Sequence, residues 1–237
     1  MDPARFDLFS LLFTILALLG LPRLLRGWRA LVAPQASAEG EALAVYVAIF
    51  LAVPLATLGH ELGHLVVARA LGAADATLHY RVFWGYVAYS GLLSPRQDWW
   101  VALAGNAVSW ALAASGLLLS RAALPPGLRS AARTFGVVEL IHTLVAYPLL
   151  SLTDLPGADW IVIYGRPVWP GTWGVALLHL ATLLWLRREL RRGPLLPASA
   201  TAAGGELVSR GAPAGSDGAP DVPPADAGAA PEETKPV

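Results

Sequence analysis

The chain has few of the residues on which many proteins depend. Among its 237 residues there is no cysteine, only 14% are charged, and Lys235 is the only lysine. The lack of cysteine excludes disulfide bonds, thiolate metal ligands and a cysteine nucleophile. A lysine base or Schiff base inside the fold is excluded as well, because Lys235 lies close to the end of the chain. The formal net charge of zero argues against the basic surface of a nucleic-acid-binding protein, so we expect no nucleic-acid partner.

Apolar residues, by contrast, make up 55% of the chain. Soluble domains carry about 25% charged residues, so this chain has too few to cover a water-facing surface. Five apolar stretches approach the roughly 20 residues that cross a bilayer: Phe6–Leu25, Ala42–Leu71, Trp99–Leu119, Thr134–Leu152 and Gly171–Leu186. We therefore predict an all-α polytopic membrane protein with about five transmembrane helices, embedded in the lipid bilayer of the cell membrane. The heavy use of Ala, Arg, Gly and Pro is typical of a GC-rich bacterial genome.

Two further segments interrupt or follow these helices. Thr77–Ser90 is rich in β-branched and aromatic residues around Gly85, which predicts a short β-hairpin. An open sheet edge is not tolerated in lipid, so this hairpin must lie at the interface or against protein. Residues 193–237 hold eight prolines, seven glycines and no aromatic residue, which predicts a disordered tail. The transmembrane domain is thus expected over residues 1–192.

The arginines in the predicted loops divide unequally between the two sides of the membrane. One side holds ten of them: Arg23, Arg26, Arg29, Arg121, Arg129, Arg133, Arg187, Arg188, Arg191 and Arg192. The other side holds five: Arg5, Arg69, Arg81, Arg96 and Arg166. Because basic residues favour the cytoplasmic side, this bias places the N-terminus outside and the C-terminal tail in the cytoplasm.

The second apolar stretch contains the motif His60-Glu61-Leu62-Gly63-His64. Positions i and i+4 share one face of a helix, so His60 and His64 can point a ring nitrogen at one metal ion. Glu61 can then act as general base on a zinc-bound water. Ionisable residues within a transmembrane turn are costly and mark functional sites. The motif therefore predicts a zinc hydrolase site inside the membrane.

The third metal ligand is not fixed by this motif alone. The metzincin pattern needs a histidine six residues after His64, and that position is Ala70. The remaining candidates are Asp159, Asp154, Glu139, His142 and His79.

Two other functions stay open from the residues. One is a catalytically silent membrane scaffold. The other is a di-iron enzyme built on the pairs Glu61/His64 and Glu139/His142. Because a hydrolase in lipid needs a polar path for water, four residues are candidates to line the site: Asn106, Ser109, Glu139 and His142.

The motif and its surroundings resemble the site-2 protease group of intramembrane zinc metalloproteases, peptidase family M50. Gly59–Gly72 matches the family pattern H-E-x-G-H, followed by an apolar run that ends in glycine. The family's A-G-P-x-x-N is reduced to Ala104-Gly105, since Asn106 replaces the proline and Ser109 the asparagine. Asp159 takes the place of the family's aspartate ligand, although Trp160 replaces the following glycine. The resemblance covers roughly residues 42–165 and implies that they form the core of the transmembrane domain.

This resemblance implies an enzyme that cleaves peptide bonds of membrane-embedded or membrane-adjacent proteins. It further implies that His60, His64 and Asp159 hold Zn²⁺, with Asp154 as the alternative third ligand, and that Glu61 activates water. In the family the helix with the H-E-x-x-H motif runs from the outside to the cytoplasm, opposite to the direction that the arginines favour. The sequence leaves the orientation, the substrate and the oligomeric state open.

Overall fold

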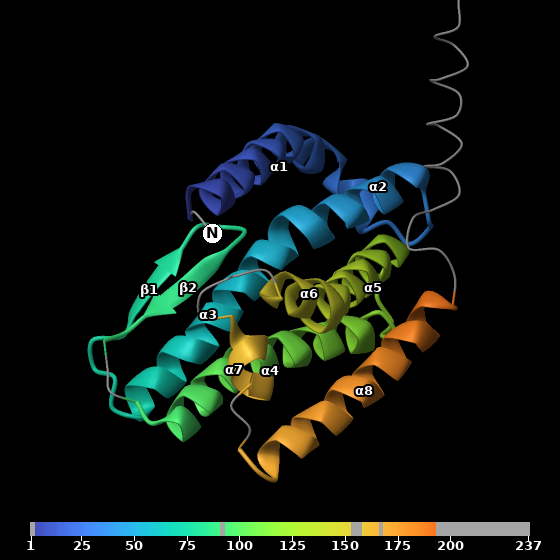
Figure 1. Ribbon diagram of the computed structural model, residues 1–237. Coiled ribbons are helices and arrows are strands. Elements are labelled where there is room, and N and C mark those ends of the chain that lie inside the picture. Colours follow the sequence, from blue (N-terminus) through green and yellow to red (C-terminus); the bar gives the residue numbers. More distant parts are fainter. Residues whose placement is uncertain (1–2, 91–92, 153–157, 166–167, 193–237) are drawn as a thin grey trace, which may run out of the picture.

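The computed structural model describes residues 3–90, 93–152, 158–165 and 168–192 and is mostly helical (Figure 1). Four helical segments are long and apolar enough to cross a membrane: Phe6–Leu31, Ala38–Ala70, Pro95–Leu119 and Pro126–Ser151. The prediction of a helical protein with several membrane-spanning segments is confirmed at this level. The predicted disordered tail, residues 193–237, lies outside the described residues.

The fifth predicted stretch forms helix α8, Gly171–Leu190, but it is not among these four segments. Its mean hydropathy is lowered by His179 in the middle and by Arg187 and Arg188 near the end. The structure thus gives four candidate spans and one further, more polar helix.

Two of the long segments contain a π-helical turn just before a proline. In the first, α2 (Ala38–Val47) passes through η1 (Ala48–Ala52) into α3 (Val53–Ala70), and Pro54 follows the π-turn. In the second, α5 (Pro126–Ile141) passes through η2 (His142–Ala146) into α6 (Tyr147–Ser151), which holds Pro148.

Proline has no N–H for the helical hydrogen bond, so a local change of winding accommodates it. Pro54 leaves the Phe50 carbonyl without its helical hydrogen bond, and Phe50 lies within the π-turn η1.

Helices α3 and α4 (Pro95–Leu119) lie side by side and carry most of the candidate site (Figure 1). A capping box begins α4. The Ser94 hydroxyl accepts a hydrogen bond from the Gln97 backbone N–H, and the Gln97 side-chain oxygen accepts one from the Ser94 backbone N–H. Gly63 allows close packing of the two helices, because a Cβ there would lie 2.9 Å from the Ala104 carbonyl oxygen. The helix with the H-E-x-x-H motif is therefore held directly against α4.

The predicted hairpin is confirmed, with antiparallel strands β1 (Thr77–Tyr80) and β2 (Gly85–Ala88). At its base, the Ser90 hydroxyl and amide both donate to the Asp75 carboxylate, and these hydrogen bonds lower the pKa of Asp75. At its tip, Ser10 of α1 (Pro3–Leu31) donates to the Arg81 carbonyl. The hairpin thus lies against protein, next to α1 and α3, as the cost of a free edge in lipid requires.

The short helix α7 (Asp159–Gly165) brings the last site residue to α3 and α4. Trp160 is buried in the main apolar core, where its ring meets that of Trp110 at 6.1 Å between centroids. Trp99 donates from its indole nitrogen to the Ile163 carbonyl, 3.1 Å away. These aromatic contacts fix α7 on α4 and so determine where Asp159 points.

Candidate metal centre

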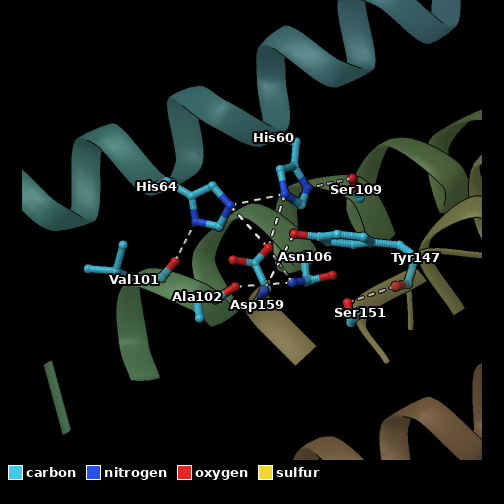
Figure 2. Close-up of polar contacts among 9 residues, drawn as sticks. All are labelled: His60, His64, Val101, Ala102, Asn106, Ser109, Tyr147, Ser151 and Asp159. Carbon is cyan, nitrogen blue, oxygen red and sulfur yellow. Dashed lines mark hydrogen bonds and ion pairs between the residues drawn. The ribbon is translucent and has the colours of Figure 1, made fainter. Parts of the chain in front are cut away.

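Three side chains from two distant parts of the chain converge at one point (Figure 2). The Nε2 atoms of His60 and His64 are 3.0 Å apart, and each lies 3.2 Å from Oδ2 of Asp159. All three side chains are nearly buried, with 13% of His60 and 10% of Asp159 exposed. The three atoms form an almost equilateral triangle of potential ligands.

Hydrogen bonds on the far side of each imidazole orient the two rings. Nδ1 of His64 lies 2.7 Å from the Val101 carbonyl oxygen, which can only accept, so Nδ1 carries the proton. In the neutral ring Nε2 of His64 then holds a lone pair that faces the triangle. Nδ1 of His60 lies 3.1 Å from the Ser109 hydroxyl, which can accept in the same way. Metal-ligating histidines are usually held by such partners.

Asp159 is held by groups from two other helices. The Asn106 side-chain nitrogen donates to Oδ2 of Asp159 at 3.1 Å and to the Ala102 carbonyl at 3.0 Å. Two acceptors fix the orientation of this amide, because only its NH₂ group can donate to them. The Asp159 backbone N–H donates to the Tyr147 hydroxyl at 3.4 Å, and Figure 2 shows this hydroxyl pointing into the cluster.

Gly105 forms the wall of the site beside the two histidines. A Cβ at this position would lie 2.3 Å from Nε2 of His64 and 2.8 Å from Nε2 of His60. No side chain can occupy that space while the rings keep their places. The backbone of α4 thus leaves room at the two nitrogens that face Asp159.

Glu61 lies next to this cluster and under the hairpin. Only 7% of Glu61 is exposed, and its charge lies close enough to interact with His60, His64 and Asp159. A Cβ on Gly85 of β2 would lie 2.9 Å from Cγ of Glu61, so the hairpin covers this side chain closely. No hydrogen bond joins the Glu61 carboxylate to another residue in the described ranges. This carboxylate is therefore free to bind a water or a substrate group.

The other candidate residues differ in where the structure places them. Asn106 contacts Asp159 directly, whereas Asp154 lies outside the described residues. Glu139 is buried, with 3% exposed, and His142 stacks on Tyr147 at 6.0 Å between ring centroids.

Neither Glu139 nor His142 belongs to the ligand cluster, and the described residues contain no second group of three or more potential ligands. The paired ligand sets that a di-iron centre needs are therefore not assembled in the described part of the chain. His79, another open candidate, lies in β1 and stacks on Tyr86.

Sequence reasoning missed three contributors to the site. Val101 acts through its backbone carbonyl, which carries no residue-type signal. Gly105 was noted only as part of the reduced family motif, and not for the space that its missing side chain leaves. Tyr147 offered a weak signal, as a hydroxyl in an apolar stretch directly before Pro148.

Comparisons of the chain with protein-family models, curated proteins and solved structures find no match. The interpretation of this site therefore depends on its own residues and geometry.

Proposed function

We propose that the protein is an intramembrane zinc metalloprotease of the site-2 type. The observation that carries the proposal is the triangle of His60, His64 and Asp159 on helices buried among apolar spans, with Glu61 beside it. Ionisable groups within a membrane-spanning segment are costly and mark a functional site.

The residues present fit a zinc ion. Tetrahedral bonds of about 2.0–2.1 Å place neighbouring ligand atoms about 3.3–3.4 Å apart, and the atoms of the triangle are separated by 3.0–3.2 Å. Two imidazoles and one carboxylate are a typical ligand set of catalytic zinc, which leaves one position open. The space beside Gly105 supports the same fit, since a side chain there would fill it.

In this mechanism zinc, when bound, supplies Lewis-acid polarisation and lowers the pKa of water to about 7. Glu61 takes the proton of the attacking water as the new C–O bond forms. It then passes this proton to the amide nitrogen as the C–N bond breaks. The second proton of the water leaves the new carboxyl group for the amine, which yields a carboxylate and an ammonium group. Asn106 and Ser109 keep Asp159 and His60 in position throughout.

The substrate class follows from the surroundings of the site. The site lies on α3 and α4, which belong to two candidate membrane spans. This position favours a membrane-embedded or membrane-adjacent protein as substrate, within the cell membrane of a bacterium. We include α8 as a fifth crossing in this proposal, because its 20 residues are long enough to span the hydrocarbon core.

Metal analysis of the detergent-purified full chain tests the proposal first. We expect about one zinc per chain in the natural protein and in Glu61→Gln, because Glu61 is not a ligand. Cleavage of a membrane-protein substrate by Glu61→Gln is expected to fall by at least about 100-fold, the usual scale for a lost general base.

Two results would contradict the proposal. Absence of zinc with His60 and His64 intact would favour a silent scaffold. Near-normal turnover in Glu61→Gln would exclude Glu61 as the base.

A further inference from the structure

One end of the helical bundle gathers most of the arginines. It is formed where α1, α4 and α8 end and where α2 and α5 begin (Figure 1). A Cβ on Gly127 of α5 would lie 2.5 Å from the Leu31 carbonyl oxygen of α1, and Arg133 of α5 donates to the Glu189 carbonyl of α8 at 2.9 Å. We call this region the arginine end. It holds Arg23, Arg26, Arg29, Arg121, Arg129, Arg133, Arg187, Arg188, Arg191 and Arg192.

Some of these arginines serve the fold by binding Glu189. The Glu189 side chain is 3% exposed, and it accepts hydrogen bonds from Arg121, from Arg192 at 3.1 Å and from the Trp185 indole at 3.1 Å. This buried cluster joins the end of α8 to the end of α4. The positive charges of Arg121 and Arg192 are therefore already paired with the Glu189 carboxylate.

Seven arginines of the arginine end are exposed, and within the described residues none of them forms an ion pair: Arg23, Arg26, Arg29, Arg129, Arg187, Arg188 and Arg191. Two acidic residues besides Glu189 lie at the adjoining start of α2, and of these Glu41 accepts a hydrogen bond from Ser130 of α5. This end of the bundle therefore carries a large uncompensated positive charge.

The hairpin end of the bundle is different. Arg81 pairs with Asp7 at 3.5 Å, and Arg69 donates to the Ala76 carbonyl at 2.9 Å. Asp75 and Asp98 add negative charge at this end. The charge of the molecule is thus polarised along the bundle axis.

We propose that the arginine end binds anionic phospholipid headgroups and so faces the cytoplasmic leaflet. Guanidinium groups bind phosphate oxygens in pairs. Each arginine near an anionic membrane surface strengthens binding roughly fivefold. His60 and His64 lie toward the opposite end of α3, so the candidate metal centre lies nearer the outer side. This direction of α3 is opposite to that of the site-2 protease family. The tests below measure lipid binding and sidedness and involve neither the metal nor cleavage, so their failure is distinguishable from failure of the proposed protease.

The first test titrates the detergent-purified full chain with lipid and measures binding by microscale thermophoresis. We expect dihexanoyl phosphatidylglycerol to bind at least about tenfold more tightly than dihexanoyl phosphatidylcholine, and more weakly at high salt. The triple variant Arg187→Gln, Arg188→Gln, Arg191→Gln should lose about 100-fold in affinity for phosphatidylglycerol. The matched triple replacement by lysine keeps the charge but not the paired guanidinium hydrogen bonds, so it should lose much less affinity than the glutamine variant. Arg96→Gln at the other end should bind normally.

Equal binding of the two lipids, or full binding by the glutamine variant, would overturn the proposal. Binding of inorganic phosphate as tight as that of phosphatidylglycerol would also overturn it, because the site would then recognise a free anion and not a membrane surface.

The second test uses the absence of cysteine, which removes all background from thiol labelling. Ala122 and Ala74 are exposed in loops at the arginine end and the hairpin end. In spheroplasts, an impermeant maleimide should label Ala74→Cys directly and Ala122→Cys only after permeabilisation. The reverse pattern would refute the inferred orientation.

Discussion

Gly105 shows that a single missing side chain shapes the metal centre. Its Cα faces the two ring nitrogens so closely that an added methyl group would lie 2.3 Å from His64 and 2.8 Å from His60. We therefore expect Gly105→Ala to lower the zinc content to less than about a tenth of that of the natural protein, measured by metal analysis of purified protein. Membrane insertion should be unchanged.

Gly174 of α8 is the matched control, because nothing lies within 4 Å of a Cβ at that position. Gly174→Ala should keep its zinc. A full complement of zinc in Gly105→Ala would mean that no ion uses the space between the two histidines.

A second residue-scale prediction concerns Asn106. Loss of its hydrogen bond to Asp159 leaves the carboxylate less well oriented, and lost partners of this kind cost about 10–100-fold in metal affinity. We expect this loss for Asn106→Ala in competition with a chelator. Ser115→Ala on the same helix removes a hydroxyl that bonds only to Ala111, so it should bind zinc normally. Equal affinities of the two variants would exclude a positioning role for Asn106.

The sequence predicted the residues of the site unevenly, for a physical reason. His60 and His64 are four residues apart, so helix geometry alone brings them together. Asp159 is 99 residues from His60, and only the resemblance to a family singled it out among several carboxylates. Its approach depends on how α7 packs on α4, which no local pattern encodes. The role of backbone groups such as the Val101 carbonyl could not be predicted from the sequence for the same reason.

The hairpin, as an element, controls the space around Glu61. Because Gly85 lies against Cγ of Glu61, a methyl group there must displace the carboxylate or the strand. We expect Gly85→Ala to retain zinc but to lose at least about tenfold in substrate cleavage, through the misplaced base. Tyr86 lies on the other face of the same strand, so Tyr86→Phe should keep both its zinc content and its rate of substrate cleavage. Loss of zinc in Gly85→Ala would instead assign the hairpin a role in holding the ligands.

Element boundaries show what hydropathy can and cannot predict. The first apolar stretch was expected to end at Leu25, but α1 continues to Leu31. Arg26 and Arg29 lower hydropathy without disfavouring the helix, because arginine is a good helix former. Pro54 and Pro148 are visible in the sequence, but hydropathy does not indicate that a π-turn precedes each of them. The hairpin was predicted correctly because its residue types differ so clearly from those of the flanking helices.

At the scale of the whole molecule, Glu189 joins α8 to the rest of the bundle. Glu189→Gln keeps the shape but removes the charge that Arg121 and Arg192 bind. We expect the free energy of unfolding to fall by about 1–3 kcal/mol, the scale of hydrogen bonds to charged groups. The midpoint of thermal unfolding in detergent should fall by about 2–4 °C per kcal/mol. Glu39 is exposed, so Glu39→Gln is the control. An equal midpoint of thermal unfolding in both variants would exclude a stabilising role for the Glu189 charge.

The segment from Ala38 to Ala70 has 33 residues, which is about 50 Å of helix against a hydrocarbon core of about 30 Å. It must tilt or extend into the headgroup layer. His60 and His64 lie only about 9–15 Å along the axis from its end at Ala70. If the proposed protease activity holds, a scissile bond that reaches them is cut near one membrane surface. A substrate helix has to unwind only its outermost turns to expose its backbone, while the rest of it stays folded in lipid.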